Sequence, residues 1–369
     1  MQVIRFKLPS LAGIRCLYSA SALGLDGYVK TRDRIKEQFI DVEAKFREKM
    51  GDFANSDSSN MIFTEDLKHM VHIVENNDED LNLVYKMTSK FSKQNQDTRF
   101  GSFIFGPVVM RMYYHLDKPL EALKCFTELE KDGFFDQLIS FQILMDLLFK
   151  HGMYEQTLEV FEVVKNKQLH GSKYPKNAVV LAFGACYKLN TPDSLNYAKK
   201  LWTELNQAGH YPMRRAGTFA AALAIQQGSP DIALEILTSL KQQGYVTIRN
   251  LKISALADLG RPDDALPLLR SALETDRAAD KNTFCEEVLN KLSAAIEKFN
   301  RKEVSQEFER INSQIKSLGH ISSSPIGELL CSEISLVPNI SEVSRTKSTR
   351  KFNQRPTNYQ LRPGLQDMN

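Results

Sequence analysis

Hydrophobic residues recur along the middle of the chain at the spacing of an amphipathic α-helix, and one phrase returns several times. The segment that begins at Glu121 reads EALKCFTELEKDG, and the segment that begins at Gln156 reads QTLEVFEVVKNKQ. Small residues anchor five copies of this phrase, at steps of 35, 41, 35 and 32 residues: Ala122, Thr157, Ala198, Ala233 and Ala265. Apolar residues follow each anchor by four and by seven positions: Phe126, Phe161, Trp202, Leu237 and Leu269, then Leu129, Val164, Leu205, Leu240 and Ala272. Since these positions share one helical face, each phrase predicts an amphipathic helix.

The ends of the phrase repeat as well. Proline stands three residues before three of the anchors, at Pro119, Pro230 and Pro262, which suits the first turn of a helix. Glycine stands eleven residues after three anchors, at Gly133, Gly209 and Gly244, which predicts a left-handed residue after the helix. The acids after the prolines, such as Asp263 and Asp264, complement the helix dipole, and this explains them without a catalytic role.

Another apolar segment that ends in a turn precedes each phrase. These segments cover residues 103–116, 138–152, 177–189, 216–228 and 248–260. Each repeat is therefore a helical hairpin that cannot bury its apolar face alone and must stack on its neighbours. The sequence predicts an all-α fold: an α-solenoid of about five stacked helical hairpins with helical caps and a disordered C-terminal tail.

The repeat resembles the pentatricopeptide repeat, whose second helix reads approximately EEALELFEEMKEKGIKPD. The segments PLEALKCFTELEKDG and LNYAKKLWTELNQAGHYP match that pattern nearly position for position. Pro212 falls where the family places its proline, fourteen residues after the anchor. A tetratricopeptide repeat instead carries a small residue at the seventh position, where this chain has mainly Leu and Val. The resemblance covers residues 103–275 as a pentatricopeptide repeat array.

This resemblance implies binding of single-stranded mitochondrial RNA. For mitochondrial members it implies a role in maturation, processing or stabilisation of transcripts, including mRNA processing, and so in respiratory-chain expression. In the family, one side chain early in the first helix and one at the end of the repeat contact a base. Carried over by alignment, the early positions fall at Pro107, Gln142, Thr218 and Asn250, and the end positions at Gln137 and Met213. The third repeat is too irregular to place, and Pro107 and Met213 break the pattern.

The candidate RNA-binding residues are therefore Gln142, Thr218 and Asn250 for bases, and Arg214, Arg215, Arg249 and Lys252 for the phosphate backbone. The basic residues stand at the starts of first helices. Ordinary surface charge is the alternative explanation of these four. Phe103, Phe105 and Phe141 could stack on bases, but packing inside the array is the simpler interpretation.

Segments outside the array have their own signatures. Residues 1–25 contain no acid but hold Arg5, Lys7 and Arg15, a composition typical of a mitochondrial transit peptide, with cleavage near Tyr18–Ser19 as a plausible site. Residues 60–100 read as a degenerate helical pair, and residues 280–318 as C-terminal capping helices. From residue 322 to 369 the chain reads as a disordered basic tail. Localisation in the mitochondrial matrix follows from the predicted leader.

Charge limits how far bulk electrostatics can support RNA binding. The chain carries a formal charge of +3, residues 1–18 hold three basic and no acidic residues, and the last 26 residues hold six basic and one acidic residue. The body between them is therefore acidic, at about −5. No segment is apolar over the roughly 20 residues that cross a bilayer, so we expect no membrane insertion.

The sequence shows no motif for catalysis or for a bound cofactor. A glycine-rich phosphate loop, a G-x-S-x-G elbow and an H-E-x-x-H helix are all missing. The five cysteines lie far apart, and no third ligand accompanies His69 and His72. We therefore expect a protein that is not an enzyme and holds no metal or cofactor.

Two functions remain open at this point. The first is an RNA-binding repeat protein, with an RNA-processing nuclease or another protein as a candidate further partner. The second is a scaffold for other proteins in a mitochondrial ribosomal or respiratory assembly complex, which binds no RNA. A basic groove along the first helices would favour RNA, whereas an apolar or acidic groove would favour a protein ligand.

Overall fold

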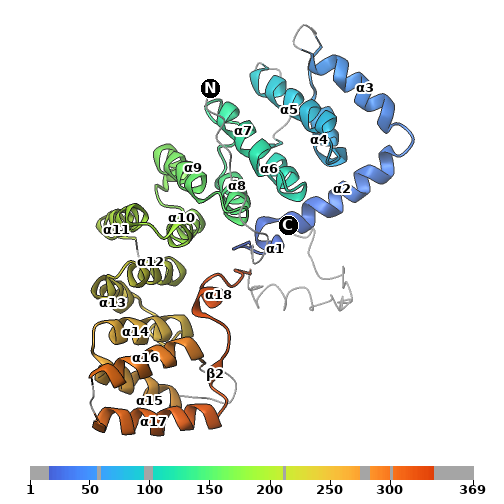
Figure 1. Cartoon of the computed structure of the whole chain (residues 1–369). Helices are drawn as coiled ribbons and strands as arrows, with labels where there is room; N and C mark the ends of the chain where they lie inside the picture. The colour runs from blue at the N-terminus through green and yellow to red at the C-terminus, as the bar shows by residue number, and fades with distance from the viewer. Residues whose placement is uncertain are drawn as a thin grey trace, which may run out of the picture. The chain divides into compact units, whose positions relative to one another are not determined.

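The structure is a computed structural model that describes residues 16–55, 60–94, 103–210, 213–274, 283–299 and 302–335. The described residues as far as Ile334 belong to one compact unit, which is built almost wholly from helices (Figure 1). Within these ranges, no helix has the length and apolar character needed to cross a membrane.

Five helical hairpins follow one another through the middle of the chain, which confirms the predicted α-solenoid. Their first helices are α6 (Gly106–His115), α8 (Leu138–Lys150), α10 (Lys176–Leu189), α12 (Arg214–Gln226) and α14 (Val246–Asp258). Their second helices are α7 (Pro119–Leu129), α9 (Tyr154–Lys167), α11 (Pro192–Gln207), α13 (Pro230–Ser239) and α15 (Leu266–Glu274). Short 3-10 turns, η2 (Leu169–Gly171) and η3 (Pro262–Ala265), follow α9 and precede α15.

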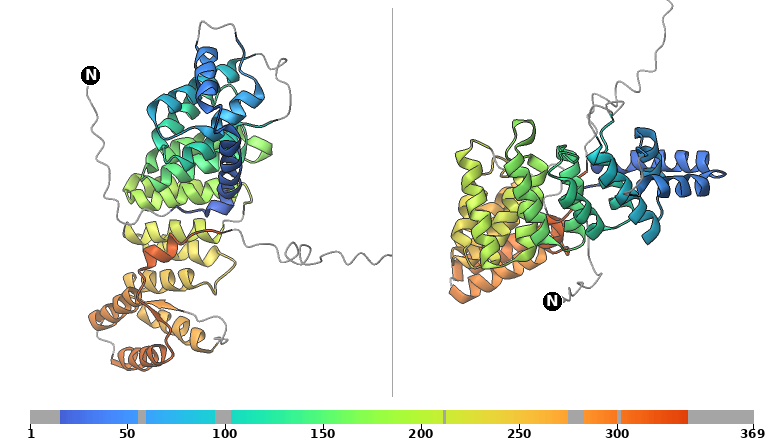
Figure 2. Two further views of the ribbon diagram at one scale, coloured as in Figure 1. Left: turned by 90° about the vertical axis from the view of Figure 1, so that its right-hand side faces the viewer. Right: turned by 90° about the horizontal axis from the view of Figure 1, so that it is seen from above.

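The hairpins stack in two layers. Each first helix packs against the next first helix, and each of α7, α9, α11 and α13 packs against its own first helix and the following one. Figure 2 shows the stack from two further sides. All five anchor residues are buried, because a small side chain lets neighbouring helices approach closely. The apolar residues four positions later, such as Phe161 and Leu237, are also buried, and only Trp202 is partly exposed.

Left-handed residues end the first helices. Asp117, Gly152, Asn190, Gly228 and Gly260 have φ angles of 58°, 72°, 49°, 69° and 69°. Between repeats, Gly133 and Gly209 are left-handed as predicted, with φ angles of 72° and 71°. The prediction for Gly244 is wrong, because α13 already ends at Ser239 and Gly244 does not have a left-handed φ.

Further helices lie before and after the array. On the N-terminal side are α1 (Ala20–Leu23), α2 (Leu25–Phe39), α3 (Glu43–Ala54), α4 (Thr64–Ile73) and α5 (Asp78–Lys93). On the C-terminal side are β1 (Phe284–Cys285), α16 (Glu286–Phe299), α17 (Lys302–Ser317), β2 (Ile321–Ser322) and α18 (Ile326–Leu330). The two short strands pair in parallel. Sequence reasoning placed no element where α2 and α3 lie.

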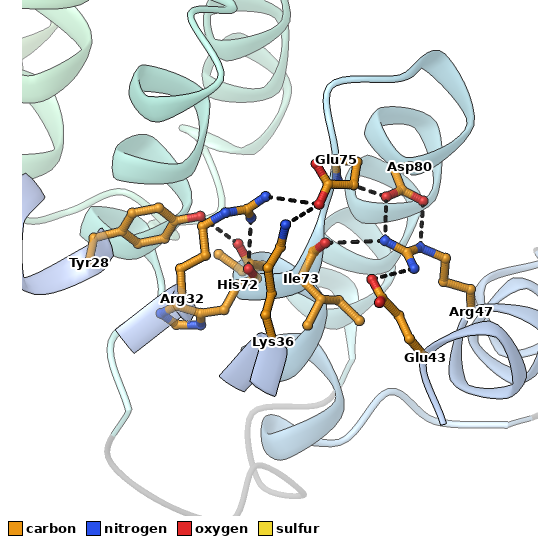
Figure 3. Close-up of polar contacts among 10 residues, drawn as sticks. Tyr28, Arg32, Lys36, Glu43, Arg47, His72, Ile73, Glu75 and Asp80 are labelled. Carbon is orange, nitrogen blue, oxygen red and sulfur yellow. Dashed lines mark hydrogen bonds and ion pairs between the residues drawn. The ribbon is translucent and has the colours of Figure 1, made fainter. Parts of the chain in front are cut away.

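Polar side chains attach α2 and α3 to the C-terminal end of α4 (Figure 3). Three of them donate to the last carbonyl oxygens of α4: Tyr28 to Val71 at 2.8 Å, Arg32 to His72 at 2.7 Å and Arg47 to Ile73 at 3.1 Å. Carbonyls at a helix end have no partner inside the helix, and positive charge there favours the helix dipole. These contacts explain how two helices with many charged residues attach to α4.

Asp80 is the centre of this polar cluster. Its carboxylate accepts hydrogen bonds from Nε and Nη2 of Arg47, both at 2.9 Å, and from the main-chain N–H of Glu75 at 2.8 Å. Asp80 is buried, whereas Arg47 remains partly exposed and also pairs with Glu43. One carboxylate therefore joins α3, the α4–α5 turn and the start of α5.

Both ends of the described chain differ from the sequence prediction. Residues 1–15 of the predicted leader lie outside the described residues, but Leu17 and Leu23, within residues 16–25, are fully buried. The expectation of disorder from Ser322 must be corrected for residues 322–335, because α18 forms there and Leu330 and Cys331 are buried. Residues 336–369 lie outside the described residues.

Candidate nucleic-acid interface

The three predicted base-contacting side chains are buried and do not line an open groove. Gln142 is 6% exposed, and Thr218 and Asn250 are 0% exposed. The amide of Asn177 donates to Gln142 Oε1 at 2.8 Å, and Asn250 Oδ1 accepts from the N–H of Cys285 at 2.8 Å. Thr218 donates to a main-chain carbonyl of its own helix. Gln142 therefore links two successive repeats, and Asn250 links the last repeat to β1.

The structure also locates the position in the third repeat that the sequence left unplaced. In the other repeats the early position stands ten residues before the left-handed residue that ends the first helix. Asn190 is the left-handed residue of the third repeat, so the equivalent position is Val180, which is buried. Sequence reasoning missed it because this repeat is irregular: its anchor Ala198 stands 41 residues after Thr157, whereas the other steps are 32 to 35 residues. Pro107 is buried as well, while Gln137 and Met213 are partly exposed.

A C-terminal segment of the same chain lies over the first helices. We call residues Ile326–Ile334 the C-terminal strap. Its helix α18 contacts α12 and α14, on the side away from the second helices (Figure 1), and Gly327 lies against the hydroxyl of Tyr187 on α10. Arg215 donates to the carbonyl oxygens of Leu329 at 3.4 Å and Leu330 at 2.5 Å, and to Ser332 Oγ at 2.7 Å. Arg215, a predicted phosphate ligand, is thus occupied.

An N-terminal segment continues this cover. The N–H groups of Leu17 and Tyr18 both donate to Asp146 Oδ1 at 3.1 Å, and the hydroxyl of Tyr114 donates to Asp146 Oδ2 at 2.8 Å. The strap joins this segment, since the N–H of Ile334 donates to the carbonyl of Leu17 at 2.8 Å. The two segments together cover inner-face positions from α8 to α14.

Asp146 predicts a pH dependence of folding. Burial raises the pKa of its carboxyl from 3.8 to about 6. A raised pKa means that the folded state binds the proton more tightly, so this stabilisation is full below pH 3.8 and is lost as pH rises through about 6. The expected loss is on the order of 3 kcal/mol. Urea unfolding at a series of pH values measures it.

Asp146→Asn is the matched variant, because an amide keeps an acceptor for Leu17 and Tyr18 but does not ionise. We expect this variant to lose most of the decline in stability between about pH 4 and pH 7. An identical decline in the natural chain and the variant would show that another group causes it.

The edge of the array at which α10, α12 and α14 begin is basic. We call this the basic edge and define it by Lys173, Lys176, Arg214, Lys241 and Arg249. The loops that lead into these helices, residues 168–176, 207–215 and 240–250, contain no acidic residue. Stacked first helices run parallel to one another, so their N-terminal ends share one edge. The positive side chains therefore follow one another from repeat to repeat.

The opposite edge carries the acids. In each hairpin the second helix begins with an acidic residue. Glu121, Glu155, Asp193 and Asp231 lie in the first turns of α7, α9, α11 and α13, and Asp263 and Asp264 lie in η3, just before α15. None of the five first helices has an acid in its first turn. The basic edge does not extend to α8, because Glu130 and Asp136 stand there and pair with Lys167. The three loops without acids belong to the last three repeats, and one acid from α11, Glu204, contacts this edge through Tyr174 and Lys165.

The cationic side chains of the edge differ in exposure. Lys173 and Lys176 are exposed, and Arg214 and Arg249 are partly exposed. The guanidinium of Arg214 lies 3.9 Å from the ring centroid of Tyr245, whose side chain is 45% exposed. Lys252, one of the predicted ligands, donates instead to Gln243, and burial lowers the pKa of its ammonium. An exposed aromatic ring beside a guanidinium suits stacking of a base next to its phosphate.

The aromatic and histidine candidates mostly serve packing. Phe105 and Phe141 are buried, whereas Phe103 is 39% exposed and its ring contacts that of Phe105. His72 stacks on Tyr28 and its Nδ1 contacts a main-chain carbonyl. Throughout the part of the chain that the structure describes, no three His, Cys, Asp or Glu side chains are grouped so that they could hold a metal ion.

Comparison with known proteins gives a consistent result. The family model described as PPR repeat matches residues 108–134 and 139–169. The chain is 30% identical over 273 residues to Pentatricopeptide repeat-containing protein 2, mitochondrial, of Xenopus laevis, which covers 73% of this chain and 70% of that protein. The protein of the same name from Mus musculus matches with the same identity and coverage. That of Danio rerio is 29% identical over 84% of this chain and 79% of its own length.

Proposed function

Since this chain belongs to the pentatricopeptide repeat family, we propose that it binds single-stranded RNA in mitochondria and acts in the maturation or stabilisation of mitochondrial transcripts. Respiratory-chain expression would depend on it through those transcripts. The protein acts by binding, and a nuclease or other partner would carry out any cleavage.

The basic edge is the observation that carries this proposal. Three successive loops without acids bring Lys173, Lys176, Arg214 and Arg249 to one side of the array, although the body of the chain is acidic overall. A line of cations that advances with the repeats fits a linear polyanion better than it fits a compact ligand. Tyr245 beside Arg214 adds a surface on which a base can stack.

The contact in this conformation would be mainly to the RNA backbone. Phosphate contacts set position and orientation but carry no sequence information, and the early positions of the repeats are buried. Binding of this kind is tolerant of sequence. It suits protection of a transcript, or its presentation to a processing enzyme, better than selection of one base sequence.

A protein scaffold is the second candidate function, and one observation favours it. The inner face already holds two other segments of the chain: Asp146 accepts hydrogen bonds from two main-chain N–H groups, and Arg215 donates to two main-chain carbonyls at the end of α18. A surface that recognises main-chain groups in this way could receive a segment of another protein. Scaffolding would leave the basic edge without a use, so we place RNA binding first.

Mitochondrial import would involve a leader shorter than residues 1–25. Cleavage at Tyr18–Ser19 would remove the two N–H groups that donate to Asp146 and leave the hydroxyl of Tyr114 as its side-chain donor. We therefore expect the N-terminus of the mature protein at or before Cys16. Mass spectrometry of the N-terminal peptide from mitochondria tests this, and a mature chain that starts at Ser19 or later would contradict it.

RNA binding is tested by titration of a labelled oligouridylate of about twenty nucleotides with the purified protein. The chain that ends at Ser335 serves beside the full chain, because it lacks the basic residues 336–369. If three to five cations contact phosphates, the logarithm of affinity should fall with the logarithm of salt concentration with a slope of about −2 to −3.5. Absence of saturable binding by either form would overturn the proposal and favour the scaffold.

A further inference from the structure

Arg215 carries a positive charge that no ion pair among the described residues neutralises. Its partners are the carbonyls of Leu329 and Leu330 and the hydroxyl of Ser332, all in the C-terminal strap. Burial, together with the charge of Arg214, lowers the pKa of this guanidinium. The neutral oxygens of the strap therefore only partly replace its lost hydration.

A phosphate group would satisfy this guanidinium better than the strap does. Hydrogen bonds between a guanidinium and a charged oxygen are roughly twice as strong as those to neutral acceptors, and the planar fork can bind a phosphate through two parallel bonds. Arg215 is also the second residue of α12, directly after Arg214 of the basic edge. The covered cation thus extends the basic edge toward the inner face.

The strap that covers Arg215 is short. It consists of the five-residue helix α18 and four further residues, and Leu330 and Cys331 are its buried side chains. The main-chain hydrogen bonds with Leu17 and Ser19 hold its far end. Tyr187 lies against Gly327 of the strap and packs on Phe219, with ring centroids 5.6 Å apart. Release of the strap would uncover a guanidinium and an aromatic ring at neighbouring places on the inner face.

We propose that Arg215 is a phosphate-binding residue for single-stranded RNA and that the strap Ile326–Ile334 masks it until RNA displaces the strap. This inference rests on the proposed function. The exchange replaces carbonyl oxygens on Arg215 by phosphate oxygens and offers the ring of Tyr187 to a base. The strap then limits tight binding to RNA that can enter the inner face, while the basic edge makes the first contact.

Three chains compared side by side test this proposal: the full chain, the chain that ends at Ser335, and the chain that ends at Pro325. The second keeps the strap without the basic tail, and the third lacks both. Affinity for the same labelled oligouridylate is measured with each. We expect the chain that ends at Pro325 to bind the oligouridylate at least about ten-fold more tightly than the chain that ends at Ser335.

Arg215→Gln separates loss of the mask from general loosening of the fold. This substitution should cancel the gain: when both truncated chains carry Arg215→Gln, we expect their affinities to differ by less than about two-fold. If the shortest chain does not fold, Leu330→Ala in the full chain serves in its place, because it loosens the strap without shortening the protein. This variant should raise the affinity for RNA, and Arg215→Gln should cancel the gain. Inorganic phosphate at constant ionic strength should compete only weakly, since the site needs the polymer.

Equal RNA affinity of the two truncated chains would contradict the claim that the strap masks Arg215. A gain in affinity that persists when the chain that ends at Pro325 carries Arg215→Gln would contradict it as well. Full displacement of the oligouridylate by inorganic phosphate would overturn RNA as the ligand of Arg215. If no form of the chain binds RNA at all, the proposed function itself fails and this inference fails with it. The pattern across the three chains therefore distinguishes the two failures.

Discussion

Replacement of Lys173, Lys176 and Arg214 by glutamate together is expected to weaken RNA binding by on the order of 10²–10³-fold. Each position lies on the basic edge, in or beside the loops that lead into α10 and α12. Each substitution removes a phosphate contact and adds a charge that repels the backbone. The salt dependence should become shallower by about two units of slope, since roughly 0.7 is lost per contact on a single strand. Fluorescence anisotropy over a series of salt concentrations measures both quantities.

Lys188→Glu is the matched control for this triple variant. Lys188 and Lys176 are both exposed lysines of α10, but they stand at opposite ends of that helix and so on opposite edges of the array. We expect Lys188→Glu to change RNA affinity by less than about three-fold. Equal losses in Lys176→Glu and Lys188→Glu would show that net charge, and not the basic edge, governs binding. Thermal unfolding of each variant should confirm an intact fold.

Asp80→Ala is expected to lower the free energy of unfolding by about 3 kcal/mol, the lower end of the range for breaking a buried ion pair, because Arg47 is partly exposed. The substitution removes the acceptor of two Arg47 hydrogen bonds and of the N–H of Glu75 (Figure 3). Arg47 would keep its ion pair with Glu43 and its hydrogen bond to the carbonyl of Ile73. Chemical denaturation of the purified protein measures the change.

Glu79→Ala controls for the charge of Asp80. Glu79 stands beside it in the first turn of α5, where both acids favour the helix dipole, but its side chain is exposed. Loss of the dipole interaction alone should cost about 0.3–1 kcal/mol. Asp80→Asn keeps a hydrogen-bond acceptor, so its loss in free energy of unfolding should lie between those of Asp80→Ala and Glu79→Ala. Similar costs for Asp80→Ala and Glu79→Ala would mean that the cluster contributes little to holding α3 in place.

The repeat array could be predicted because its signals are local. Small anchors such as Ala122 and Ala233 and apolar partners four residues later, such as Phe126, must recur if hairpins are to stack. These residues lie in the buried interior, as the spacing indicated. The family could be recognised for the same reason, since its pattern is a packing pattern.

The helices before the array could not be found this way. α2 and α3 attach through Tyr28, Arg32 and Arg47, whose partners are carbonyl oxygens and acids on other elements. Such contacts join residues 26–43 positions apart and leave no periodic apolar stripe. The strap was misjudged for a related reason: polar residues around Ser322 and Ser332 suggested disorder, whereas Leu330 and Cys331 provide enough apolar surface to dock.

The binding site was only partly accessible to sequence reasoning. Arg214 and Arg249 could be named because they start first helices. Burial of Asn250 depends on a chain segment 35 residues away that lies against it, and periodicity carries no such information. The contrast between the two edges becomes visible only once the first helices are known to run parallel to one another.

Ultraviolet crosslinking of the protein in intact mitochondria, with sequencing of the attached RNA, tests the central claim most directly. We expect crosslinked mitochondrial transcripts well above the level of an unrelated matrix protein, and loss of most crosslinks in the Lys173, Lys176 and Arg214 triple variant but not in Lys188→Glu. Recovery of RNA at the background level, with the protein intact and imported, would contradict RNA binding and leave the scaffold as the function to pursue.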